Sequence, residues 1–192
     1  MRIISGTLRR RQLATPDFEG VRPTSDRLRE TLFNILAPRV EGATVLDGFA
    51  GTGALGIEAL SRGAAHATFV DADRRALALV AENIRRCGVA ERCAIIRGGL
   101  IETSAGLEHA PFDLVLLDPP YTCDTEEMSD VLRAVSRALG AGGLVVLEHA
   151  RRREAPPEAG ELRRTRTVTS GDSVLSFYQR SDSRRADREQ HA

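Results

Sequence analysis

Two short motifs carry side chains that could act together in one reaction. The first is the glycine-rich run DGFAGTGALG at 47–56, which satisfies the pattern G-x-G-x-x-G through Gly51, Gly53 and Gly56. The second is Asp118-Pro119-Pro120-Tyr121, which directly follows the apolar run FDLVLL. A glycine loop of this kind lets the backbone approach a bound cofactor closely. The pair therefore predicts a cofactor-dependent reaction on a substrate held at the second motif.

Asp47 indicates which cofactor the glycine loop suits. It stands at the carboxyl end of an apolar segment, immediately before the loop. A pyrophosphate at this place would meet a carboxylate, and two like unit charges roughly 5–6 Å apart repel by about 3 kcal/mol at an effective dielectric near 20. S-adenosylmethionine has no phosphate and carries a cationic sulfonium and an ammonium group. The charge of Asp47 therefore favours S-adenosylmethionine over a dinucleotide.

Further residues of the loop complete the expected cofactor site. Asp71 follows Gly51 by 20 residues and ends the next apolar segment, where it could accept hydrogen bonds from both ribose hydroxyls. Thr52 and Gly53 belong to the same expected site. An alternative is that Asp47 caps the following turn and Asp71 caps a helix beginning at Asp73. Phe49 either lines the cofactor cleft or packs beneath the loop.

The Asp118–Tyr121 motif suits methylation of an exocyclic amine on a nucleic-acid base. Such an amine is a weak nucleophile, because its lone pair is delocalised into the ring, so it must be held in line with the methyl donor. The Asp118 carboxylate and the Pro119 carbonyl could each accept one amine hydrogen, while Pro119 and Pro120 stiffen the turn. Tyr121 could stack on the base, a contact worth about 1–3 kcal/mol. The alternatives are an ordinary proline turn and a tyrosine in the core. We expect neither a covalent intermediate nor a metal.

Alternating strands and helices must position these motifs. We expect strands at 44–48, 66–70, 93–97, 112–117 and 143–148, and helices near 54–62, 73–87 and 125–139, with left-handed caps at Gly63, Gly88 and Gly140. Segments 162–168 and 173–179 are typical of a closing antiparallel hairpin. The fold class is therefore α/β, a doubly wound, mostly parallel, seven-stranded, Rossmann-like sheet. Its first and fourth strands are neighbours at the switch point, so both motifs open on one crevice.

Charge divides the chain into three regions. Residues 1–40 carry eight arginines against four acids, residues 41–150 carry nine against sixteen, and residues 151–192 carry ten against seven. We interpret 1–40 as a basic extension of a small hairpin plus a helix, 41–180 as the catalytic domain and 181–192 as a disordered tail. The helix is expected to begin near Thr24 or Ser25 and to end at Pro38. Basic ends around an acidic centre are compatible with a nucleic-acid partner.

Composition narrows the cellular setting. Cys87, Cys93 and Cys123 form no CxxC pair, which indicates reduced thiols rather than disulfides or a zinc site. No apolar run approaches the roughly 20 residues that cross a bilayer, and the first residues lack a secretory signal. We therefore expect a cytoplasmic protein.

The motifs resemble a known family. Class I methyltransferases that modify amino groups carry [DNS]-P-P-[YFW] after the fourth strand, and the chain resembles in particular the RsmD-type family. The likeness covers about residues 1–180 and includes MRIISGTLRRRQL, RPTSDRLRETLFNIL, DGFAGTGALGIEALSRGA, FVDAD and FDLVLLDPPY. The resemblance implies S-adenosylmethionine as cofactor and methylation of the N2 amine of a guanine in 16S ribosomal RNA, within an assembling small subunit.

The resemblance also assigns residues. It implies cofactor contacts by Asp47, Phe49, Gly51, Gly53 and Asp71, and an acceptor site at Asp118 to Tyr121. Two departures stand out: Gly48 replaces a larger apolar residue, and RGGL at 97–100 lacks the Asp or Asn that relatives place near the adenine. Adenine recognition is then expected from backbone and from Leu100. Candidates for RNA phosphate contacts are Arg9, Arg10, Arg11, Arg22, Arg27 and Arg29, although Arg27 and Arg29 could equally form ion pairs on the helix surface.

Three other functions remain compatible with the sequence. The same motif serves base-amine methylation of DNA, although no separate target-recognition domain is evident. The glycine pattern permits a nicotinamide-dependent dehydrogenase, against which Asp47 argues. A non-catalytic RNA-binding protein with the same fold is a third alternative, against which the intact Asp118–Tyr121 motif argues. In every catalytic case the target base must be unpaired or flipped out of its helix.

Overall fold

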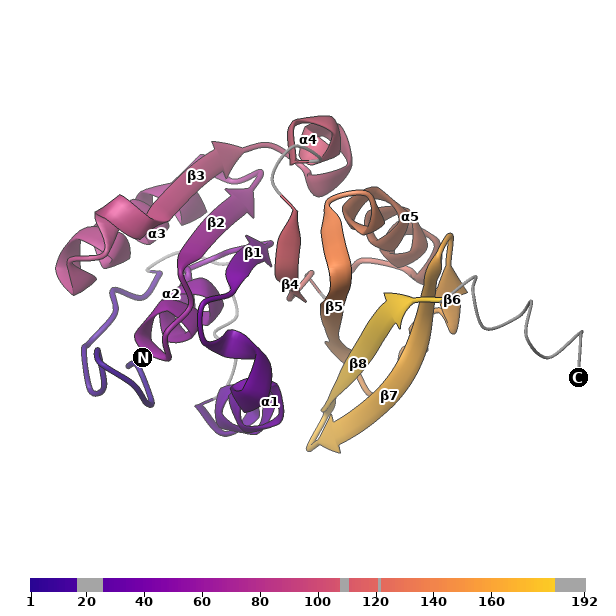
Figure 1. Ribbon diagram of the computed structural model, residues 1–192, viewed down its shortest axis with the longest axis horizontal. Coiled ribbons are helices and arrows are strands. Elements are labelled where there is room, and N and C mark those ends of the chain that lie inside the picture. Colours follow the sequence, from indigo (N-terminus) through magenta and orange to yellow (C-terminus); the bar gives the residue numbers. More distant parts are fainter. Residues whose placement is uncertain (17–25, 108–110, 121, 182–192) are drawn as a thin grey trace, which may run out of the picture.

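One continuous sheet with helices on both faces organises the molecule (Figure 1). The computed structural model describes residues 1–16, 26–107, 111–120 and 122–181. The strand order is β3-β2-β1-β4-β5-β8-β7-β6, and the first five strands in the chain run parallel. The strands are β1 Thr44–Gly48, β2 His66–Asp71, β3 Cys93–Arg97, β4 Phe112–Leu117, β5 Leu139–Ala150, β6 Glu158–Ala159, β7 Leu162–Ser170 and β8 Ser173–Arg180. The doubly wound α/β class is confirmed.

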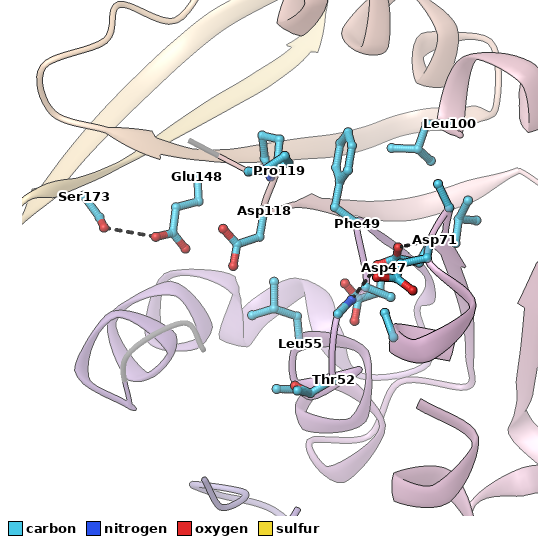
Figure 2. Close-up of a pocket in the computed structure, with 18 of the residues that line it drawn as sticks. Asp47, Phe49, Thr52, Leu55, Asp71, Leu100, Asp118, Pro119, Glu148 and Ser173 are labelled. Atoms are coloured by element: carbon cyan, nitrogen blue, oxygen red, sulfur yellow. Dashed lines mark hydrogen bonds between the residues drawn. The ribbon is translucent and has the colours of Figure 1, made fainter. Parts of the chain in front are cut away.

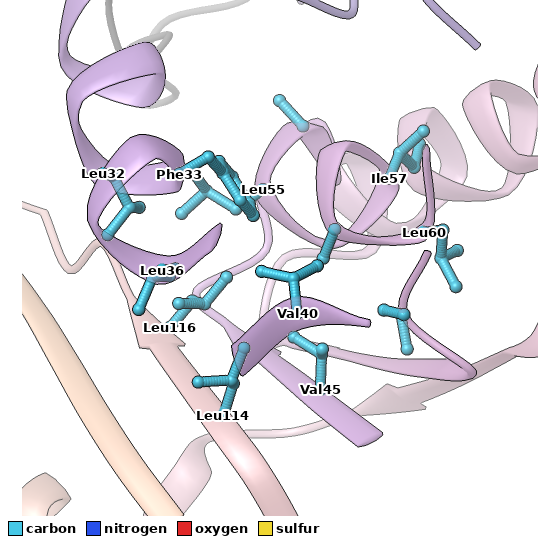
Figure 3. Packing of buried hydrophobic residues seen from close by; sticks show 14 of the residues in the cluster. Leu32, Phe33, Leu36, Val40, Val45, Leu55, Ile57, Leu60, Leu114 and Leu116 are labelled. Atoms are coloured by element: carbon cyan, nitrogen blue, oxygen red, sulfur yellow. The ribbon is translucent and has the colours of Figure 1, made fainter. Parts of the chain in front are cut away.

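The helices divide between the two faces. They are α1 Asp26–Val40, α2 Ala54–Ser61, α3 Arg74–Cys87, α4 Leu100–Leu107 and α5 Thr125–Ser136, with a single 3-10 turn at Ala90–Arg92. Alternate residues of one strand feed two separate clusters: Leu114 and Leu116 pack with α1, α2 and α3, whereas Val115 and Leu117 pack with α4 and α5. Figure 3 shows the first cluster, where Leu36 of α1 lies next to Leu116 of β4 and Phe33 of α1 lies beside Leu55 of α2. This period-two burial is what a sheet covered on both sides requires.

The sheet has eight strands, so our expectation of seven was wrong. The additional strand, β6, has two residues that pair with Arg163 and Leu162 at the sheet edge. A two-residue strand is too short to show an alternating pattern in sequence. The predicted closing hairpin is present as β7 and β8, which are joined at Gly171 and Asp172.

Three local predictions also need correction. The helix does not end at Pro38, because α1 continues to Val40, which is buried in the core; a proline in the last turn removes a single helical hydrogen bond. Gly140 is not a left-handed cap but lies inside β5, which begins at Leu139. Helix α4 was missed altogether, since its eight residues include Ser104 and Gly106 and show no long apolar repeat. The expected starts at Thr24 and Ser25 lie outside the described residues.

The N-terminal segment packs against the main core. Arg2 and Gln12 form an antiparallel bridge, which agrees with the expected small hairpin. Ile3 and Leu13 are buried in the cluster that contains α1 and α2. Within the described residues, no helix has the length and apolar character needed to span a bilayer.

Candidate active site

A cavity of about 840 Å³ opens at the carboxyl ends of β1, β2, β4 and β5. This volume lies in the range of about 300–1,000 Å³ that is common for ligand sites. Both sequence motifs contribute to its wall, as the switch-point argument predicted. The residues that line this cavity include Asp47, Phe49, Gly51, Thr52, Asp71, Leu100, Asp118, Pro119, Pro120, Glu148 and Ser173 (Figure 2).

Asp71 fixes the shape of the glycine loop. One carboxylate oxygen accepts the Gly51 N–H at 2.9 Å and the other accepts the Asp73 N–H at 2.9 Å. Phe49 and Gly51 have φ values of 59° and 55°, so this loop turns sharply through left-handed backbone. The cap of α3 is Asp73, whose side chain accepts the Arg75 N–H, and not Asp71. Asp71 therefore joins the ends of two neighbouring strands at the cavity wall.

Asp47 is a buried carboxylate at the floor of the cavity. It is 1% exposed, and its Oδ2 accepts the Gly56 N–H at 2.8 Å. Burial raises the pKa of Asp47 well above its ordinary value, the Gly56 N–H opposes the rise, and the nearby carboxylates of Asp118 and Asp71 add to it. A cation bound beside Asp47 would favour its ionised form. Gly56 is required here, because a Cβ would lie 2.4 Å from Phe69 Cε1.

The other residues predicted to bind the cofactor lie in different places. Thr52 lines the cavity, and so does Phe49, which is the first of its two expected roles. Gly53 is not among the lining residues; it precedes α2 with φ 75°, and a Cβ there would point at Phe69 and Val80 in the core. Its contribution is to the turn of the loop rather than to the wall.

Gly48 and Leu100 form one packing unit. Leu100, at the start of α4, is 3% exposed and lines the cavity. A Cβ on Gly48 would lie 2.7 Å from Leu100 Cδ1 and 2.8 Å from Leu117 Cδ2. The departure at Gly48 is thus explained: the volume that a larger residue would occupy is filled by the Leu100 side chain.

The acceptor side continues directly from β4. The Asp118 N–H lies 3.5 Å from the Gly48 carbonyl, which continues the β1–β4 pairing by one residue. Figure 2 shows the Asp118 carboxylate and Pro119 beside Phe49 at the cavity. Tyr121, the predicted stacking residue, lies outside the described residues.

Sequence reasoning missed two acceptor-side contributions. Glu148, near the end of β5, lines the cavity, as does the β7–β8 turn at residues 170–173. Ser173 Oγ donates to Glu148 Oε1 at 3.0 Å. The signal for Glu148 was available, because it ends the apolar run of the strand beside β4. No local signal marks the turn, which reaches the cavity only because β8 lies beside β5 in the sheet.

The predicted arginines do not form one group. Arg27 is exposed and lines the cavity, whereas Arg9, Arg10 and Arg11 are exposed on the N-terminal segment, where Arg11 Nη1 donates to the Arg86 carbonyl at 3.2 Å. Arg22 lies outside the described residues.

Of the two roles left open for Arg29, burial excludes the phosphate contact. Its side chain is 0% exposed and forms ion pairs with Asp26 at 2.8 Å and Glu58 at 4.0 Å, so the ion-pair alternative holds, although in the core rather than on the surface. Its guanidinium also donates to the Arg2 carbonyl at 2.6 Å, and Glu58 accepts the Ile4 and Ser5 N–H groups. Arg29 therefore ties the N-terminal segment to α1 and α2.

The charge of the cavity fits a cationic cofactor. Carboxylates on its described wall come from Asp47, Asp71, Asp73, Asp118, Glu148 and Asp172, and arginines from Arg27 and Arg75. Such a wall repels a pyrophosphate and attracts a sulfonium, which decides against a dinucleotide. Phe49, Leu55 and Leu100 supply apolar contact area for the rest of the ligand. Within the described part of the chain, no cluster of three or more His, Cys, Asp or Glu could hold a metal.

Fold, glycine loop and acidic cavity together define an S-adenosylmethionine-dependent methyltransferase of class I architecture. More particularly, the chain belongs to the RsmD family: the family model described as "Conserved hypothetical protein 95" matches residues 1–179. The chain is 36% identical over 180 residues to "Ribosomal RNA small subunit methyltransferase D" of Escherichia coli, which covers 94% of this chain and 90% of that relative.

Two further comparisons agree. The enzyme with the same name in Haemophilus influenzae is 37% identical over 151 residues, 77% of this chain and 78% of the relative. The solved structure of the Escherichia coli protein yhhF superposes with a TM-score of 0.81 at 34% identity and covers 94% of this chain and 98% of that chain. The resemblance stated from the motifs is thereby confirmed.

Proposed function

We propose that this protein methylates the exocyclic N2 amine of a guanine in 16S ribosomal RNA, within an assembling small subunit in the cytoplasm. The observation that carries the proposal is that Asp118, Pro119 and Pro120 share one cavity with Asp47 and Asp71. An amine held by the first group would face a methyl donor held by the second. The names of the Escherichia coli and Haemophilus influenzae relatives support ribosomal RNA as the substrate.

The chain's own residues would act by positioning and electrostatics. S-adenosylmethionine, when bound, supplies an electrophilic methyl group. Asp47 and Asp71 hold the cationic ligand, and the bend of the loop at Gly51 allows the backbone to come close. Asp118 and the Pro119 carbonyl each accept one amine hydrogen, so that the nitrogen lone pair points toward the donor. Tyr121 is proposed to stack on the flipped base.

Arginines are proposed to hold the RNA around this cavity. Arg27 stands at the cavity itself, and Arg9, Arg10 and Arg11 are exposed on the N-terminal segment. Arg22 is proposed with them from the sequence pattern. Contacts of this kind position the RNA through its phosphates and carry no base information.

Mass spectrometry of ribosomal RNA nucleosides tests the proposal. RNA from cells that lack this protein should be short of one N2-methylguanosine in 16S RNA, and purified protein with labelled S-adenosylmethionine should restore it on small subunits from those cells. Naked DNA, free 16S RNA and small subunits are compared side by side. Preferential labelling of DNA would replace the ribosomal substrate by the DNA alternative.

A further inference from the structure

Glu148 stands beside Asp118 at the ends of adjacent strands. Leu117 of β4 pairs with Leu147 of β5, so the next residues on each strand, Asp118 and Glu148, are also neighbours. Strands in a sheet lie about 4.8 Å apart. Figure 2 shows both carboxylates on the same side of the cavity, whose wall both residues line. Two carboxylates one strand apart therefore face the same ligand space.

The β7–β8 turn holds Glu148 in this orientation. Glu148 is 7% exposed, and its Oε1 accepts a hydrogen bond from Ser173 Oγ at 3.0 Å. Ser173 begins β8, which pairs antiparallel with β5 next to this point. Burying a carboxylate is costly unless hydrogen bonds compensate it. A side chain that only tied the hairpin to β5 would not need a negative charge at the wall of a cavity that is already acidic.

Adjacent acceptors select a base edge with adjacent donors. Guanine carries its N2 amine next to the N1–H group, so two donors stand side by side. In adenine and cytosine the exocyclic amine stands next to a ring nitrogen that has a lone pair and no hydrogen. That lone pair would meet a carboxylate, which is repulsive and leaves a buried acceptor without a donor.

On this basis, which rests on the proposed function, we propose that Glu148 accepts the N1–H of the acceptor guanine while Asp118 accepts an N2 hydrogen. Glu148 is thus the residue that restricts the site to guanine, and Ser173 is a positioning residue that orients it. The Asp118-Pro119-Pro120 turn recognises an amine, and Glu148 recognises which base carries it.

A substrate analogue that lacks the N1–H group of guanine tests this role. 2-Aminopurine keeps the 2-amine of guanine but has an unprotonated N1 and no oxygen at C6, so the comparison of wild type with the Glu148 variant isolates the N1 contact. Small subunits are reconstituted with 16S RNA that carries either guanine or 2-aminopurine at the mapped target position, and kcat/KM is measured for both with labelled S-adenosylmethionine. Wild type should prefer guanine by about 100-fold, a size expected where a site's buried polar group loses its partner.

Glu148→Gln should narrow this preference at least about tenfold, because the amide NH₂ can donate to the N1 of 2-aminopurine. The ratio of preferences cancels any difference in the reactivity of the two amines. Glu126→Gln removes an exposed carboxylate on α5 and should leave the preference unchanged. Ser173→Ala should reduce turnover on guanine by a few-fold and lower the preference for guanine over 2-aminopurine. Calorimetry with S-adenosylhomocysteine verifies that each variant is folded.

Two results would overturn the inference. One is equal use of guanine and 2-aminopurine by wild type, which requires no variant at all. The other is a Glu148→Gln enzyme that keeps the wild-type preference. Failure of the proposed function is distinguishable: wild type would then place no methyl group on any guanine N2 of 16S RNA, whatever residue occupies position 148.

Discussion

The two halves of the cavity are built in different ways. The donor half, formed by residues 47–56 and Asp71, is held together by carboxylates that accept backbone N–H groups: Asp47 accepts from Gly56, and Asp71 accepts from Gly51. The acceptor half, formed by Asp118–Pro120, Glu148 and the turn at 170–173, brings together segments from three strands that lie far apart in the chain.

Because of this difference, recognition of the cofactor and recognition of the acceptor base depend on different parts of the fold. The donor half depends largely on loop geometry within residues 47–56, where Asp47 accepts the Gly56 N–H, and on Asp71, which joins the loop from the end of the adjacent strand. The acceptor half depends on the order of β4, β5 and β8 in the sheet, and its key side-chain contact joins Ser173 to Glu148. Variants in one half should therefore leave the other half's ligand largely unaffected.

Among the variants, Asp118→Ala should show the largest difference between methyl transfer and cofactor binding. Methyl transfer should fall by at least about 100-fold, as when one preorganised hydrogen-bonding group is removed from a catalytic site. Binding of S-adenosylhomocysteine, measured by calorimetry, should persist. Asp118→Asn keeps an acceptor oxygen and should retain more activity than Asp118→Ala. Unchanged turnover of Asp118→Ala would refute the role of this carboxylate.

Asp71→Ala is the matching change in the donor half. It removes the acceptor for the Gly51 and Asp73 N–H groups, so the KM for S-adenosylmethionine should rise by about 10- to 100-fold, as expected for loss of charged hydrogen bonds. The KM for the RNA substrate should change little. Asp130→Ala, which removes a half-exposed acid on α5 paired with Arg133, serves as the control. An RNA-specific defect would contradict the division into halves.

Asp47→Asn should weaken binding of the cofactor and raise the stability of the fold. Because burial raises the pKa of Asp47 in the folded protein, wild-type stability falls as the pH rises from the ordinary value of 3.8 toward the raised value. The amide variant escapes this loss, so its advantage in melting temperature should be full at alkaline pH and vanish in acid. Its affinity for S-adenosylmethionine should drop more than its affinity for uncharged-sulfur S-adenosylhomocysteine. Thermal melts across a pH series and calorimetry check both; a less stable variant at alkaline pH would contradict the account.

Arg27→Ala should give the smallest effect. Loss of one phosphate contact lowers the slope of log affinity against log salt by about one. Binding of small subunits at several salt concentrations measures this. Arg29→Met is the informative neighbour: Arg29 is buried, so this variant should lose stability through its broken ion pairs rather than alter the salt slope. An unchanged slope in Arg27→Ala would remove Arg27 from the RNA surface.

The sequence revealed the donor half better than the acceptor half. The strand ends at Asp47 and Asp71 follow from apolar runs bounded by glycines, and their mutual approach follows from the parallel topology. Glu148 ends an apolar run and could have been found by the same reasoning, whereas the turn at 170–173 could not, since its approach depends on an antiparallel strand returning beside β5. The sequence left Arg29 open between a phosphate contact and an ion pair, both at the surface, because a charged residue on an amphipathic helix is usually exposed. Its burial could not be foreseen, since it depends on the buried partner Glu58 on α2.

Helix ends show the same limit. Gly63 and Gly88 have the left-handed backbone that their positions predicted, whereas Gly140 is taken into β5, where a Cβ would lie 3.3 Å from the Phe112 carbonyl. Close approach between β4 and β5 is a tertiary requirement, and local sequence does not distinguish it from a helix cap.

A crystal structure of the protein with S-adenosylmethionine bound tests the central claim most directly. The account predicts the sulfonium near Asp47, the ribose hydroxyls at Asp71, and the methyl group directed across the cavity toward Asp118 and Pro119. A ligand whose sulfur lies away from Asp47, or whose methyl group points away from the Asp118–Pro120 turn, would contradict it.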